Sequence, residues 1–82
     1  MTTSLQGRAV HKLSNRGSRL AVIVLEPWGG EYDIGPDQAL DLVIEGTLDA
    51  RLEIEIEDDR LTIISSGPDL TITRDGNPIA AR

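Results

Sequence analysis

The residues best suited to chemistry lie between Glu26 and Tyr32, in the run Glu-Pro-Trp-Gly-Gly-Glu-Tyr. This run holds the only Trp and the only Tyr of the chain, with a Glu close to each. Aromatic rings can stack on a sugar or another flat ligand while nearby carboxylates bind its hydroxyl groups. The candidate ligand-binding residues are therefore Glu26, Trp28, Glu31 and Tyr32. In the alternative interpretation, Trp28 caps one end of the core and Tyr32 fills its edge, since the chain has no Phe.

The usual catalytic arrangements find little support in this sequence. The absence of Cys excludes thiolate zinc sites and thiol nucleophiles. His11 is the only His, so it cannot supply the several imidazole ligands of a cupin metal centre. Carboxylate pairs for glycoside hydrolysis can be drawn among Glu26, Glu31 and Asp33, but a small sandwich has little room for the necessary pocket. We therefore predict a protein that is not an enzyme, with no catalytic residues, no metal site and no cofactor.

The candidate residues follow the most apolar run of the chain, Leu20–Leu25, which is aliphatic on both faces and so predicts a central, buried strand. Pro27 should end that strand, and Gly29 and Gly30 should supply the positive φ angles of the corner. Alternating segments bounded by turn residues follow at 31–34, 39–45, 51–57, 61–65 and 70–74. This pattern predicts an all-β fold, a small antiparallel β-sandwich or partly open barrel of about five to seven strands.

The length of 82 residues fits one small domain. We expect residues 1–18 to form a flexible basic N-terminal segment, with an edge strand at 8–13 as the alternative, and residues 19–82 to form a single β-sandwich domain. Asp75-Gly76 predicts a type I′ hairpin turn, because both central positions of that turn need positive φ.

Both faces of the strand 20–25 need a cover, whereas a two-layer sandwich buries only one face of each sheet. Ala21, Ile23 and Leu25 could be covered by the N-terminal segment, by a barrel-like closure or by a second subunit. The sequence leaves these three alternatives open, and a homodimer is one of them.

The net charge of -6 is unevenly distributed, since the first nineteen residues hold four basic residues and no acid. If 39–45 and 51–57 pair as a hairpin, one surface carries an acidic face made of Asp41, Glu45, Glu53, Glu55 and Glu57. Such a face could hold a divalent cation, dock a basic protein partner or receive the basic N-terminal segment. The alternative is a solvated surface that keeps the sheet from pairing with other chains.

An acidic body disfavours nucleic acid, because affinity for phosphate comes mostly from Lys and Arg. The longest apolar run is far shorter than the ~20 residues of a membrane helix. We therefore expect a cytoplasmic protein that binds neither nucleic acid nor membrane.

The residues Val24–Gly29, then Glu31–Asp33, spell V-L-E-P-W-G-x-E-Y-D, and Arg74–Gly76 adds a late R-D-G turn. Across Leu20 to Gly76 the chain resembles a family of small uncharacterised bacterial all-β proteins. The resemblance implies a compact sandwich with a cupin-like outline and brings no known activity. The expected function is a non-enzymatic binding or assembly module that can form a homodimer. The alternative is a cupin-like small-molecule-binding or weakly catalytic domain that uses the Trp28 corner.

Overall fold

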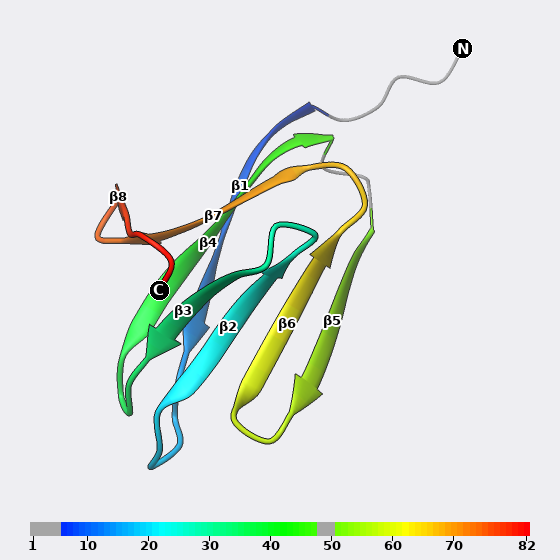
Figure 1. The fold of residues 1–82 in the computed structure, drawn as a ribbon. Helices are drawn as coiled ribbons and strands as arrows, with labels where there is room; N and C mark the ends of the chain where they lie inside the picture. The colour runs from blue at the N-terminus through cyan, green and yellow to red at the C-terminus, as the bar shows by residue number, and fades with distance from the viewer. Residues whose placement is uncertain (1–5, 48–50) are drawn as a thin grey trace.

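The protein is described by a computed structural model covering residues 6–47 and 51–82, which form strands and no helix (Figure 1). In chain order the strands are β1 Gln6–Ser14, β2 Ala21–Glu26, β3 Gly30–Ile34, β4 Ala39–Thr47, β5 Leu52–Glu57, β6 Arg60–Ser65, β7 Asp69–Arg74 and β8 Asn77–Pro78. Sheet A has the order β1-β4-β7-β8 and sheet B the order β3-β2-β6-β5. The predicted all-β sandwich is confirmed. It has eight strands and not five to seven, because β1 and the two-residue β8 join sheet A, and one of its strand pairs, β2 with β6, is parallel and not antiparallel.

The core lies between the two sheets and is built from aliphatic side chains. Sheet B supplies Ile23, Leu25, Ile34 and Ile63, and sheet A supplies Leu40, Leu42, Ile44, Leu70 and Ile72. Ile23 and Leu25 are therefore covered by sheet A of the same chain, so this face needs no second subunit. On the other face of β2, Val24 is only 5% exposed, between Glu31 on β3 and Thr62 on β6. Within these described ranges no helix is long and apolar enough to cross a membrane.

The expected hairpin of 39–45 with 51–57 is wrong. β4 pairs with β1 and β7 in sheet A, whereas β5 pairs with β6 in sheet B. The acidic face therefore does not form, because its carboxylates are divided between two sheets. The register gives a physical reason, since Arg8 lies opposite Glu45 and Lys12 opposite Asp41. Opposite charges facing each other across strands are stabilising, while the expected hairpin would have set carboxylates against carboxylates.

The N-terminal basic segment thus contributes the edge strand that was the alternative for residues 8–13, and β1 is longer than expected. Val10 on β1 and Thr71 on β7 flank Val43, which is only 3% exposed on the outer face of sheet A. β4 is therefore a central strand, and Val43 is buried even on its outer face.

The turns agree with the sequence at most positions. Asp75 (φ 51°) and Gly76 (φ 84°) both have positive φ, as a type I′ turn requires. At the corner after β2, Gly29 has positive φ (79°), but Gly30 does not and begins β3 instead. Ile79 follows β8 and packs against the core.

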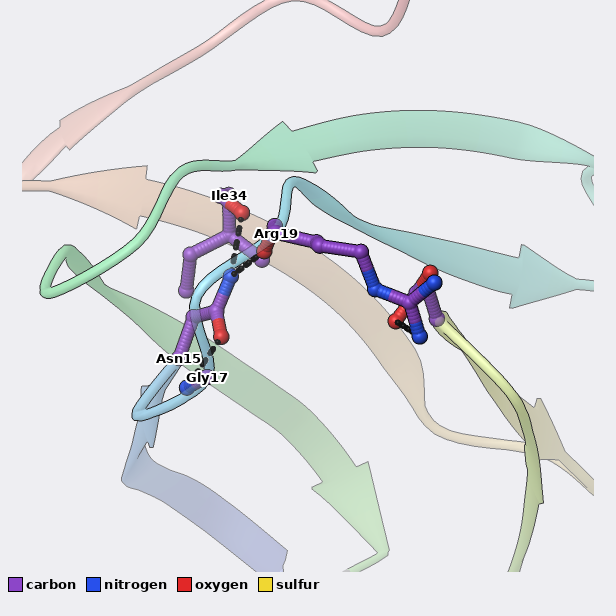
Figure 2. Close-up of polar contacts among 5 residues, drawn as sticks. Asn15, Gly17, Arg19 and Ile34 are labelled. Carbon is purple, nitrogen blue, oxygen red and sulfur yellow. Dashed lines mark hydrogen bonds and ion pairs between the residues drawn. The ribbon is translucent and has the colours of Figure 1, made fainter.

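Asn15 holds together the point where the chain crosses from sheet A to sheet B (Figure 2). Its side-chain amide donates to the carbonyl oxygens of Arg19 (2.8 Å) and Ile34 (2.9 Å). Its side-chain oxygen accepts a hydrogen bond from the N–H of Gly17 at 2.9 Å. Beside this cluster, Arg19 forms an ion pair with Asp59 at 3.4 Å. One side chain therefore fixes the loop after β1 to the end of β3.

Substitution of Asn15 by Ala should lower the free energy of unfolding by about 1–3 kcal/mol, because two backbone carbonyls lose their donor. Asn15→Asp should be no better, since it keeps the acceptor and removes both donors. Urea denaturation followed by circular dichroism measures the difference. Asn77→Ala, on an exposed residue of β8, is the control and should be near neutral. An Asn15→Ala protein as stable as the control would contradict this role.

Candidate functional site

The two aromatic residues of the predicted site lie together. Trp28 is in the turn between β2 and β3 and is 53% exposed. Tyr32 lies opposite Ile23 in the sheet, which directs it to the core side of sheet B. Both residues line a shallow pocket of about 320 Å³. The structure therefore brings the two aromatic residues of the predicted site to one pocket.

The two glutamates of the predicted site do not line this pocket. Glu31 neighbours Tyr32 in β3 and so lies on the outer face of sheet B. There its carboxylate is 3.4 Å from the guanidinium of Arg82 and 3.8 Å from that of Arg60. Glu26 lies opposite Ile64, on the same outer face. The structure therefore separates both carboxylates from the aromatic pair.

The acidic residues that line the pocket are Glu45 on β4 and Asp69 at the start of β7, which lie opposite each other on neighbouring strands of sheet A. By the register, both share the outer face of sheet A with Val43. Leu25 and Leu70 provide apolar lining. Aromatic faces beside carboxylates favour an organic cation, through cation–π attraction and direct charge pairing. No pattern in the sequence could have joined Glu45 and Asp69 to Trp28, because three separate segments contribute them.

A second surface stands out on β5. Ile54 and Ile56 lie opposite Ile63 and Leu61 in the register, so they share the core-side face of sheet B. Nevertheless Ile54 is 57% exposed and Ile56 is 80% exposed. The alternation of residues along 51–57 predicts both as core residues, and this prediction is wrong. We call Ile54 and Ile56, on this face of β5, the overhang.

The overhang is exposed because sheet A does not extend far enough to cover it. Leu13 of β1 lines a small pocket of about 160 Å³ together with Ala21 and Ile23 of β2, Ile34 of β3 and Leu61 of β6, and no residue of β5 lines it. Figure 1 shows β5 at the right-hand side of sheet B, beyond the strands of sheet A. The opposite face of β5 carries Glu53, Glu55 and Glu57, all exposed.

His11 is exposed on β1. In the part of the chain that the structure describes, no group of three or more His, Asp or Glu side chains is arranged to hold a metal ion. A comparison of the chain with protein-family models, curated proteins and solved structures finds no match. The resemblance to a bacterial family stays a prediction, and the site must be argued from its own residues.

Trp28→Ala should lower the free energy of unfolding by less than about 1 kcal/mol, because over half of Trp28 is already in water. Leu25→Ala, in the buried core beside it, should cost about 2–5 kcal/mol. Urea denaturation followed by circular dichroism compares the two, since Trp28→Ala removes the only Trp. A loss as large as that of Leu25→Ala would mean that Trp28 is a core cap and not a displayed ring.

Proposed function

We propose that this protein is a non-enzymatic assembly module that self-associates through the overhang. The observation that carries the proposal is the exposure of Ile54 and Ile56 on a face whose other residues are buried or half-buried along sheet B. Burial of one Ile side chain stabilises by about 1.5–3 kcal/mol relative to full exposure. Burial of these two neighbouring, largely exposed Ile side chains in a contact between two chains would therefore stabilise an oligomer.

The position of the overhang at a sheet edge strengthens this proposal. Edge strands of monomeric proteins are commonly protected by charged side chains, including charges that point toward the core side. In β5 the charges occupy the outer face alone, at Glu53, Glu55 and Glu57, and the core side is Leu52, Ile54 and Ile56. This distribution keeps one face of the strand in water and leaves the other suited to a protein surface.

Ile56→Asp should convert an oligomer into a monomer, because a carboxylate at the centre of an apolar contact would be buried without a partner. Sedimentation velocity over a range of concentrations measures the change, and circular dichroism verifies the fold. Leu20→Asp is the matched control, since Leu20 is similarly exposed (53%) but lies in the turn before β2. A wild-type protein that stays monomeric at high concentration would overturn the proposal.

A small-molecule-binding function at the Trp28 corner is the second candidate. The shared pocket of Trp28 and Tyr32, with Glu45 and Asp69 at its edge, supports it. The chemistry of these residues fits an organic cation whose alkylammonium group lies against the aromatic faces.

Choline should quench or shift the fluorescence of the single Trp in a saturable way, whereas its uncharged carbon isostere should not. Glu45→Gln combined with Asp69→Asn should weaken choline binding by about fivefold or more, which corresponds to roughly 1 kcal/mol. Glu53→Gln, on the outer face of β5, is the control. Equal responses to choline and to the isostere would contradict a cation site.

A further inference from the structure

We propose that the overhang is covered by a second copy of this chain, in a closed dimer in which β5 of each copy pairs with β1 of the other. This inference rests on the proposed self-association and specifies the elements that meet. Four observations lead to it: a missing strand, two free edges, their charges and their symmetry.

The first observation is that sheet A lacks a strand opposite β5. β1 is the last strand of sheet A, and its residue Leu13 lines a pocket with residues of β2, β3 and β6 but with none of β5. A strand added beside β1 would extend sheet A toward β5 and toward the exposed Ile54 and Ile56. Addition of a partner's strand to a free sheet edge is a common mode of protein recognition.

The second observation concerns the strand edges. At the other side of the sandwich, the chain covers its own edge: the N–H of Arg82 donates to the carbonyl of Glu31 (2.8 Å), and Arg82 Nε lies 2.9 Å from Asp33. β7 is partly covered by β8. Among the described strands, β1, β3, β5 and β8 are the four edge strands, and β1 and β5 are the longest of them. Their remaining backbone N–H and C=O groups can pair with another chain.

The third observation is that these two edges carry opposite charge. Arg8 and Lys12 lie on the outer face of β1, opposite Glu45 and Asp41, with the half-exposed Val10 between them. The outer face of β5 carries Glu53, Glu55 and Glu57. Pairing β5 with a second β5 would oppose carboxylates to carboxylates, and pairing β1 with β1 would oppose cations. Pairing β1 with β5 sets Arg8 and Lys12 against glutamates, which is the favourable arrangement.

The fourth observation is that this contact is compatible with a closed, two-fold symmetric dimer. In a two-fold rotation about an axis along the strands, sheet A of each copy continues into sheet B of the other. The two overhangs then face each other across the axis, with Ile54 and Ile56 of one copy against Ile54 and Ile56 of the other. Each copy gives one β1 edge and one β5 edge, so both edges are used and the assembly ends at a dimer.

Reversing the charges on each of the two edges tests this arrangement. Two variants are needed, and each carries several substitutions. The first variant carries Glu53→Lys, Glu55→Lys and Glu57→Lys on β5, and the second carries Arg8→Glu and Lys12→Glu on β1. Each variant alone should dimerise at least about tenfold more weakly than wild type, because each now opposes like charges. Mixed together, they should form a heterodimer near wild-type affinity, since both of its strand pairs again unite opposite charges. Sedimentation velocity of the single and mixed samples measures this.

A cross-link provides a second readout, in case reversal of Arg8 and Lys12 weakens the contact of β1 with β4. The chain has no Cys, so single Cys residues can be introduced at the centres of the two edges by Val10→Cys and Glu55→Cys. Under oxidation the mixture of the two variants should give a disulfide-linked dimer, and neither variant alone should. Wild-type stability in the reduced state verifies that both variants fold.

The outcomes separate this inference from the function on which it rests. A wild-type monomer overturns both. A dimer that Ile56→Asp abolishes, but that shows neither rescue in the charge mixture nor the mixed disulfide, leaves the overhang as the contact and overturns the pairing with β1. A dimer that neither variant weakens, combined with a preference of the lysine variant for wild type as its partner, indicates pairing of β5 with β5 and overturns the inference. Oligomers that grow beyond a dimer with concentration overturn the closed two-fold arrangement.

Discussion

The structure depends on the burial of one aliphatic layer between two sheets of unequal width. Ile23, Ile63 and Ile72 are almost fully buried in that layer, and no aromatic residue lies at its centre. The fourth strand of sheet A is the two-residue β8, and sheet A leaves Ile54 and Ile56 of β5 exposed on the core side of sheet B. The same mismatch explains the stable middle of the protein and the exposed apolar edge. Fold and proposed function therefore have a common physical origin.

The charges on the outer face of sheet A agree with the observed pairing of β4 with β1. β4 could have met β5, its successor in the chain, yet its outer carboxylates lie beside the cations of β1. β5 is left with carboxylates that lie next to Thr62 and Arg60 on β6. The basic residues of β1 thus lie beside acidic residues of β4 within the same domain. At the unpaired edge of β1, the same Arg8 and Lys12 side chains can also lie beside a strand of a second chain.

Much of the fold could be predicted from local sequence, because alternation with period two identifies each strand and its core-side residues. Leu40, Leu42, Ile44 and Ile72 are buried as that pattern indicates. Ile54 and Ile56 show the same alternation and are exposed, because the reach of the opposite sheet is a tertiary property. The predicted ligand-binding residues do not all line one pocket, for a related reason. Glu31 is next to Tyr32 in sequence, but adjacent residues of a strand lie on opposite faces, and the carboxylates near Trp28 come from β4 and β7.

The composition of β5 favours an interface over a merely solvated edge. A strand that only had to stay in water would gain from polar residues on both faces, since Ile at an exposed position lowers solubility and invites pairing with other chains. β5 instead keeps Ile at the two positions where the cover of sheet A ends, and confines its charges to the face that any two-layer assembly leaves in water. Leu52, on the same side, already packs against the core. The apolar row of β5 therefore begins inside the domain and continues beyond it, which is the geometry expected of a core completed by another molecule.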